Sequence, residues 1–168
     1  MPHTRPIVEA LGYELYCGGV FIAAPLLQSS TVAGRVRVVG ADARPDAQHD
    51  AFEQKLLVDH AAFGCLSFWC VSGERAYPFV FRPRRVGGLV PYAQLVYCRS
   101  TDDLVRFARP IGWALASRVR PLVMVDANGP IEGLTGRYFA DLKPKYFKGP
   151  DRPRLGDLAY TETAMFGV

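Results

Sequence analysis

The chain has 168 residues, of which 49% are hydrophobic, and it carries 20 basic and 16 acidic side chains. This length predicts one domain, or at most two very small ones, and the abundance of Phe and Tyr argues against a chain that is disordered throughout. A net charge of +4 favours anionic ligands, such as a phosphate-bearing small molecule, without implying nucleic acid.

The N-terminal part predicts a short helix followed by strands. Residues 4–11 are expected to be helical, because Thr4 can cap this segment and Gly12 can end it. The stretch YELYCGGVFIAAPLL, residues 13–27, predicts two strands joined by a Gly-Gly turn, which is a hairpin. The alternating RVRVV, residues 35–39, predicts a strand with one solvent-exposed face.

The middle of the chain predicts a helix and then three strands. Residues 51–63 read as a helix that Asp50 caps and Gly64 ends. Three apolar side chains at helical spacing are expected on one face, namely Phe52, Leu56 and Phe63. The strand candidates are CLSFWCV, AYPFVFR and PYAQLVYCR, and an antiparallel meander is their simplest arrangement.

The last third predicts a helix, a buried strand and a final strand. STDDLVRFARPIGWALASR, residues 100–118, is expected to be a helix that Pro110 kinks or divides. PLVMVDANGP is a continuous apolar run ended by turn residues, so a fully buried strand is expected there. An irregular segment follows, until LAYTETAMFGV again predicts a strand. The fold class is therefore α+β (mixed α/β), with a mostly antiparallel sheet, one parallel crossover and flanking helices.

This order of elements resembles the GNAT acyltransferase superfamily. RPIVEALGYELYCGGVFIAAP is similar to the end of a GNAT domain, and KGPDRPRLGDLAYTE resembles the C-terminal end of bacterial acyl-CoA acyltransferase-like proteins. The resemblance implies that residues 1–27 are the tail of a first GNAT-like unit and that residues 28–168 form a second, divergent one. It also implies a twisted, mostly antiparallel sheet and an acyl-CoA or acetyl-CoA substrate whose acyl group passes directly to an amine.

GNAT enzymes hold the pyrophosphate of acyl-CoA with a Q/R-x-x-G-x-G/A loop at a helix start, where backbone N–H groups face the phosphates. One stretch matches formally, RPIGWA, which makes Arg109 and Gly112 candidate cofactor-binding residues. The alternative places RPIGWA inside a helix, where those N–H groups are already bonded. If that helix starts at Thr101, Asp102 and Asp103 put negative charge where a phosphate would lie. A near match, RRVGGL, is better read as a glycine turn with exposed arginines.

Acyl transfer to an amine needs a base for the amine and an acid for the leaving thiolate. The candidate catalytic residues are Asp126, Tyr160 and Glu162, with Glu132 and Asp157 as further acids. Asp126 ends the predicted buried strand and could face a cleft, or it could cap the turn DANG. Tyr160 could reach the acyl site, or it could be a half-buried strand residue.

Basic residues crowd the segment before the predicted last strand. Because apolar residues follow it, we read this segment as a fixed loop whose Lys148 and Arg152 could clamp phosphates, or which could be a solvated rim.

The cysteines Cys17, Cys65, Cys70 and Cys98 show neither C-x-x-C spacing nor a His at zinc-site spacing, so we expect reduced core thiols and no metal. Such thiols, and a start without an apolar leader segment, fit a cytoplasmic protein. The longest apolar stretch is too short to span a bilayer.

Two functions remain open from the sequence. The first is an acyl-CoA-dependent N-acyltransferase, whether intact or incomplete in this chain, with a small-molecule acyl donor and an amine acceptor. The second is a non-catalytic, GNAT-shaped binding or interaction module that has kept the core and lost the cofactor loop. Nucleic acid is not the expected partner, because no RRM, KH or helix-turn-helix signature is present. If the first unit is incomplete, an exposed sheet edge would favour a homo-oligomer.

Overall fold

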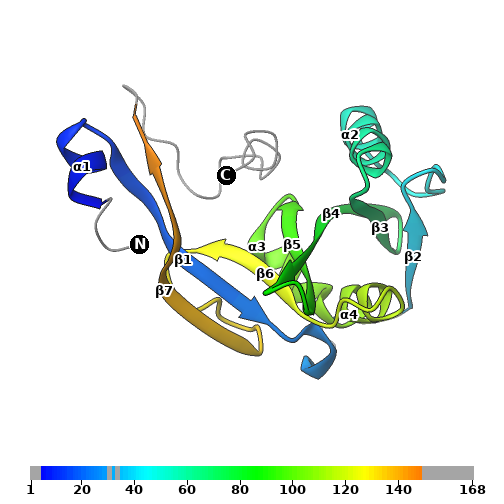
Figure 1. Ribbon diagram of the computed structural model, residues 1–168. Coiled ribbons are helices and arrows are strands. Elements are labelled where there is room, and N and C mark those ends of the chain that lie inside the picture. The colour runs from blue at the N-terminus through cyan, green and yellow to red at the C-terminus, as the bar shows by residue number, and fades with distance from the viewer. Residues whose placement is uncertain (1–4, 30–31, 33–34, 149–168) are drawn as a thin grey trace.

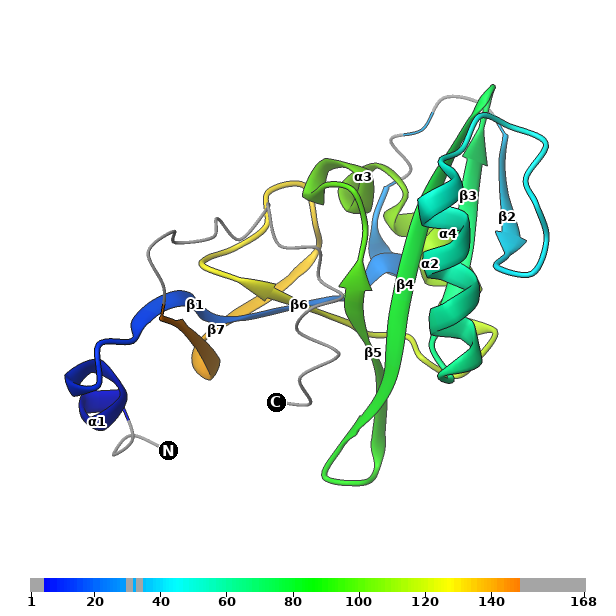
Figure 2. The same ribbon diagram turned by 90° about the horizontal axis from the view of Figure 1, so that it is seen from above.

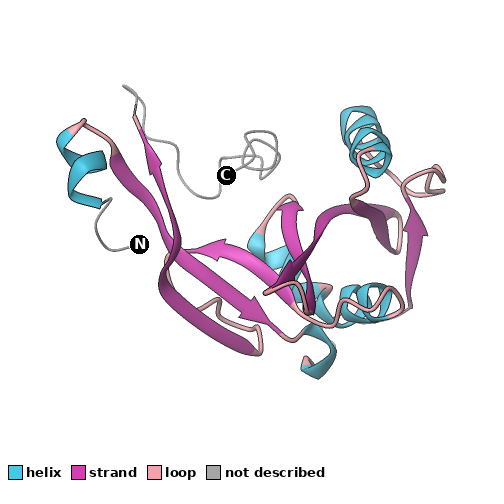
Figure 3. Ribbon diagram, viewed as in Figure 1, coloured by secondary structure: helices cyan, strands magenta, loops and turns pink. Residues whose placement is uncertain are grey.

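The computed structural model describes residues 5–29, 32 and 35–148. In these residues a seven-stranded mixed sheet has the order β2-β3-β4-β5-β6-β1-β7, accompanied by four α-helices (Figure 1; Figure 3). The elements in chain order are α1 (Arg5–Ala10), β1 (Glu14–Ala23), the 3-10 turn η1 (Pro25–Leu27), β2 (Val36–Gly40), α2 (Ala51–Ala62), β3 (Leu66–Ser72), β4 (Arg75–Val86), β5 (Val90–Tyr97), α3 (Thr101–Arg106), α4 (Ala108–Ala116), β6 (Val123–Ala127) and β7 (Gly136–Phe147). The predicted α+β class is confirmed.

Strands β3 to β5 form the antiparallel meander that the sequence predicted, and β2 pairs with β3, also antiparallel. Between β4 and β5 the chain reverses through Gly87 and Gly88, whose φ angles are +56° and +75°. Glycine adopts these left-handed conformations without the steric cost that a Cβ would bring. The stretch RRVGGL therefore contains a glycine turn, as the sequence predicted.

Helices α3 and α4 carry the chain from β5 to β6, which pairs with β5 in parallel. Pro110 divides the predicted single helix: it has no N–H to give to the carbonyl of Arg106, and α3 ends at that residue. β6 lies between β5 and β1, and all five of its residues are buried. The interior strand predicted from PLVMV is confirmed.

The predicted N-terminal hairpin is wrong, because residues 14–23 form one continuous strand, β1. Gly18 and Gly19 lie inside that strand, where its register against β7 shifts. A Cβ on Gly19 would come within 2.3 Å of the carbonyl oxygen of Phe139. The glycine pair therefore allows a close crossing of β1 and β7, instead of a turn, and β1 becomes an interior strand between β6 and β7.

The segment predicted to be irregular is the edge strand β7, whereas the predicted last strand, residues 158–168, lies outside the described residues. Asp141 and Lys143 of β7 have φ angles of +57° and +54°, so the strand bends sharply. With the outer half of β1 and α1 it forms an arm that extends away from the rest of the sheet (Figure 1). Its lysines, proline and glycine obscured the strand in the sequence, although such residues are usual at a sheet edge.

Helix α2 ends one residue earlier than predicted, at Ala62, and has the predicted cap, since the Asp50 side chain accepts a hydrogen bond from the Phe52 N–H. Of the three residues predicted to share one face, only Leu56 is buried, because Phe52 and Phe63 are 70% and 87% exposed. The helix instead rests on β3 and β4 through Glu53, Leu56 and Leu57.

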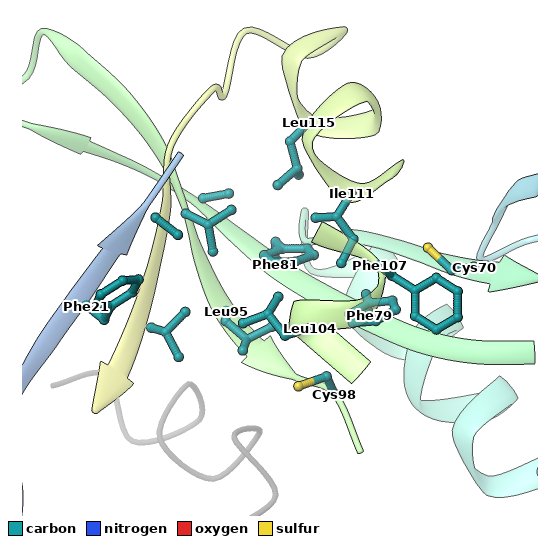
Figure 4. Packing of buried hydrophobic residues seen from close by; sticks show 14 of the residues in the cluster. Phe21, Cys70, Phe79, Phe81, Leu95, Cys98, Leu104, Phe107, Ile111 and Leu115 are labelled. Carbon is teal, nitrogen blue, oxygen red and sulfur yellow. The ribbon is translucent and has the colours of Figure 1, made fainter. Parts of the chain in front are cut away.

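The core occupies both faces of the sheet. Helices α3 and α4 cover one face, where Leu104, Phe107, Ile111 and Leu115 meet the phenylalanines of β1, β3 and β4 (Figure 4). Helix α2 covers the other face, over β3 and β4, so that these strands lie between α2 and α4 (Figure 1; Figure 2). No helix among the described residues has both the length and the apolar character that crossing a bilayer would require.

Candidate functional site

Strands β5 and β6 diverge shortly after they meet. They share two paired positions, Ala93 with Val123 and Gln94 with Met124. Beyond these positions the register of β5 against β4 shifts, so that Val96 falls between two paired residues, as in a β-bulge. Bulges bend a strand and are frequent beside functional sites. The divergence leads to a cleft of about 360 Å³ that lies between the start of α3 and the loop after β6.

The start of α3 carries negative charge toward that cleft. Asp102 lines the cleft, and the adjacent Asp103 is the second acid in the first turn of the helix. The Ser100 hydroxyl oxygen accepts a hydrogen bond from the Asp103 N–H at 3.1 Å, so this donor already has a partner. Burial raises the pKa of the Asp103 carboxyl, which shows that its charged form is poorly solvated.

Asp126, a predicted catalytic residue, lies at the end of β6 and lines the same cleft. It is 3% exposed, and one carboxylate oxygen, Oδ2, accepts from the Lys145 ammonium of β7. The other oxygen, Oδ1, has no hydrogen-bond partner among the described residues. The structure thus brings together a buried carboxylate and a lysine 19 residues later in the chain, a pairing that the sequence did not suggest.

The turn after β6 is tied to β1 by Asn128. Its side-chain Oδ1 accepts from the Gly18 N–H at 2.6 Å, and its Nδ2 donates to the Tyr16 carbonyl at 2.9 Å. The stretch DANG is therefore fixed by its Asn, while its Asp pairs with Lys145. These two hydrogen bonds explain how the cleft keeps a defined wall on the β6 side.

A second ion pair, in which the Glu53 carboxylate is buried and the Arg99 side chain is partly exposed, lies at the carboxyl end of β5. Arg99 donates to both carboxylate oxygens of Glu53, at 2.6 and 2.5 Å, and the Tyr97 hydroxyl donates to Glu53 at 3.1 Å. Burial, followed by the Glu53 charge, raises the pKa of Tyr97 to about 12. The contact of Glu53 with Arg99 and Tyr97 was not predicted from the sequence. Its available signal was Glu53 lying beside Leu56 and Leu57 on a helix, a position that belongs to the buried face.

A larger groove, of about 660 Å³, runs between α4 and the edge strand β2. Its floor contains Val36 and Val38 of β2 and Phe68 of β3. Helix α4 and the residues after it supply Arg109, Trp113 and Arg118. Sequence reasoning missed Trp113 and Arg118, although Trp113 lies off the apolar stripe of Leu104, Ala108, Ile111 and Leu115.

The formal phosphate-loop match RPIGWA lies entirely within α4, in agreement with the alternative that placed it inside a helix. Gly112 is buried, and a Cβ there would come within 2.8 Å of the Leu26 backbone nitrogen and 2.9 Å of the Pro25 carbonyl carbon. Gly112 therefore allows η1 to pack closely on α4, and the backbone of η1 occupies the space beside it that a phosphate would need. Arg109 lies in the groove and not at the strand-end cleft.

The remaining predicted site residues are far apart or outside the described residues. Lys148 follows β7, donates to the Leu11 carbonyl at 2.7 Å and lies 5.4 Å from the Tyr13 ring centroid, so it belongs to the arm. Arg152, Tyr160 and Glu162 lie outside the described residues, and their roles stay predictions. Glu132 lines the strand-end cleft with Asp102 and Asp126. Within residues 5–29, 32 and 35–148, no three His, Cys, Asp or Glu side chains are grouped so that they could hold a metal ion.

Comparison with known protein families found no matching family, and comparisons with curated proteins and with solved structures likewise gave no match.

Proposed function

We propose that this chain is a non-catalytic binding module whose sheet has GNAT-like strand order. The observation that carries the proposal is the start of α3, where Asp102 and Asp103 occupy the first turn. In the superfamily that the sequence resembles, the corresponding helix start receives the pyrophosphate of acyl-CoA. Here a phosphate would meet two carboxylates.

Electrostatics oppose cofactor binding at this position. The positive end of a helix dipole attracts an anion by roughly 0.3–1 kcal/mol. A carboxylate at about 4 Å from a phosphate would repel it by about 1 kcal/mol in water and by about 4 kcal/mol at an effective dielectric constant of 20. Asp102 lines the cleft directly, and Ser100 already engages the Asp103 N–H. The repulsion between the carboxylates and a phosphate therefore exceeds the attraction of the helix dipole.

Acyl transfer is a second candidate, which a separate observation favours. The parallel strands β5 and β6 separate after two paired positions, beside the irregularity at Val96. A gap of this kind suits an extended thioester arm, and the buried Asp126 lines the adjoining cleft. In that case an amine would attack the thioester carbonyl, lose a proton to a base and release the thiolate of CoA. Arg152, Tyr160 and Glu162 would then be the residues to test.

Thermal unfolding with acetyl-CoA separates the two functions. A ligand at one hundred times its dissociation constant stabilises the folded state by about 2.7 kcal/mol. We expect no stabilisation by millimolar acetyl-CoA that depends on Asp102, and no release of free thiol when amines are added. Stabilisation that is enhanced by Asp102→Asn, together with amine-dependent thiol release, would overturn the proposal and establish acyl transfer.

A control variant tests whether the loss of one negative charge anywhere on the surface changes the response to acetyl-CoA. Asp42→Asn removes a surface carboxylate that does not line the strand-end cleft. It should not change the response to acetyl-CoA. A response that rises equally in Asp42→Asn and Asp102→Asn would reflect overall charge and not a site at α3.

A further inference from the structure

The groove between α4 and β2 is built from two regular rows of side chains. Arg109, Trp113 and Ser117 are spaced by four residues, so they form one row along α4 and into its C-cap. Val36, Val38 and Gly40 alternate along β2, so they share the face that looks toward α4. The groove thus has a polar and aromatic wall on the helix and an apolar floor on the sheet.

The charged side chains that line the groove are both arginines. Arg118 donates one hydrogen bond to the Ala114 carbonyl at 2.8 Å, which fixes its guanidinium beside the groove and leaves further N–H donors. Arg109 lies more than two turns earlier and is exposed. Asp42 packs beside Gly40 at one end, and it is not one of the lining side chains. Two arginines without a carboxylate among the lining residues favour an anion.

Trp113 adds a flat, apolar surface beside these cations. Its side chain is 63% exposed, although the other tryptophan, Trp69, is completely buried. An indole exposed over a cavity that also contains Val36, Val38 and Phe68 offers a stacking surface for another ring. A volume of about 660 Å³ lies within the range of small-molecule sites.

From these observations we infer that the α4–β2 groove binds a small molecule with a planar ring and an attached anionic group, either phosphate or carboxylate. The ring lies against Trp113 and the valines, and the anionic group accepts hydrogen bonds from Arg109, while Arg118 adds positive charge along the groove. This goes beyond the proposed function, because it names a ligand class and a site on the opposite edge of the sheet from β1 and β7.

Fluorescence and thermal unfolding can test this site directly. The probes are adenosine 5′-monophosphate and 4-hydroxyphenylacetate, with adenosine and inorganic phosphate as the ring-only and anion-only controls. Both tryptophans fluoresce, but a ligand in the groove should change the emission of Trp113, since Trp69 lies in the α2 face of the core. At least one ring-bearing anion should bind with a dissociation constant below about 1 mM and about tenfold more tightly than adenosine and inorganic phosphate do. If only adenosine 5′-monophosphate binds, the groove prefers a phosphate. If only 4-hydroxyphenylacetate binds, the groove prefers a carboxylate.

Variants locate the binding. Arg109→Ala and Trp113→Ala should each weaken the probe about tenfold, because each removes one of the two kinds of contact. Trp113→Phe keeps a ring, so it should retain binding, observed by thermal unfolding, while losing the fluorescence response. Arg85→Ala, in the distant β4–β5 hairpin, should leave the affinity unchanged. All of these side chains are exposed, and circular dichroism checks that each variant folds.

Two results would overturn the inference: no response to either ring-bearing anion at concentrations up to about 10 mM, or binding that Arg109→Ala and Trp113→Ala leave unchanged. These failures differ from a failure of the proposed function. Acetyl-CoA contains an adenine nucleotide, so stabilisation by acetyl-CoA that disappears in Arg109→Ala supports the groove. Stabilisation that persists in Arg109→Ala, with thiol release, refutes only the non-catalytic module.

Discussion

Lys145 of β7 reaches past β1 to form an ion pair with Asp126 of β6, so one salt bridge joins strands that are not neighbours in the sheet. The two side chains are 17% and 2% exposed. Cys17 of β1 lies opposite Lys145 in the sheet, and its thiol donates to the Gly19 carbonyl at 3.2 Å. The Lys145–Asp126 ion pair therefore holds β7, where it crosses β1, to the end of β6.

Removing the lysine should destabilise the fold strongly. Lys145→Met leaves the Asp126 carboxylate buried without its cation, and the expected loss of unfolding free energy is about 3 kcal/mol. Urea denaturation measures this loss. The double variant Lys145→Met with Asp126→Asn should recover part of it, because no bare charge remains. The exposed pair Lys55–Asp59 is the control, and Lys55→Met should cost less than about 1 kcal/mol. Equal losses in both single variants would contradict this account.

Two glycines should respond very differently to the same added methyl group. In Gly19→Ala the new Cβ would come within 2.3 Å of the Phe139 carbonyl oxygen, so β1 and β7 must separate. We expect a loss of about 3 kcal/mol, at the upper end for overpacking. In Gly129→Ala nothing lies within 4 Å of the Cβ. That variant should stay within about 0.5 kcal/mol of the parent in urea denaturation. A tolerated Gly19→Ala would show that the crossing is looser than described.

The stability of the protein should fall between pH 10 and 12 partly because of Tyr97. Burial and the Glu53 carboxylate raise its pKa from 10.0 to about 12. In this window the unfolded chain loses the phenolic proton while the folded protein keeps it, so rising pH favours unfolding. Buried thiols such as Cys98, whose pKa burial raises to about 12, add to the same slope. Tyr97→Phe should make the slope of unfolding free energy against pH shallower. An unchanged slope would contradict the described burial of the hydroxyl and its contact with Glu53.

The thiols should react slowly and in a fixed order. Cys17, Cys70 and Cys98 are buried, whereas Cys65 is partly exposed. Burial raises the pKa of all four, which keeps the reactive thiolate scarce at neutral pH. A thiol reagent at a mildly alkaline pH of about 8 should therefore label Cys65 first, and all four only in denaturant. Native Cys65→Ser should label much more slowly than the parent, and rapid labelling of that variant would contradict the described burial.

The sequence allowed the parts of the fold with local signals to be predicted. The meander, the capped helix α2 and the buried strand β6 each show clear periodicity or turn residues. The Gly-Gly pair in β1 led to the wrong prediction of a hairpin, since glycine occurs both in turns and at close contacts between strands. Strand β7 was missed because a bent edge strand tolerates lysine, proline and left-handed residues.

In the candidate sites, too, the residues with a local sequence signal were predicted and those placed by tertiary structure were not. Asp126 could be anticipated from its place at the end of a buried strand. Its partner Lys145, by contrast, depends on how β7 crosses β1, which no short-range pattern contains. Arg109 was singled out as part of a phosphate loop, and the structure places it in a groove formed with the much earlier strand β2. The division at residue 27 stays a prediction, and β1 is part of the same sheet as the rest.

The interior position of β1 has a consequence for protein synthesis. Its sheet partners begin at Val123 and end at Phe147, so the ribosome must add about a hundred residues before either neighbour exists. At roughly 5–20 residues per second, Val20 and Phe21 would wait on the order of ten seconds without a partner strand. A nascent chain in this condition is a natural client for chaperones that hold apolar segments. Moving the first 27 residues behind β7 by circular permutation should shorten that wait.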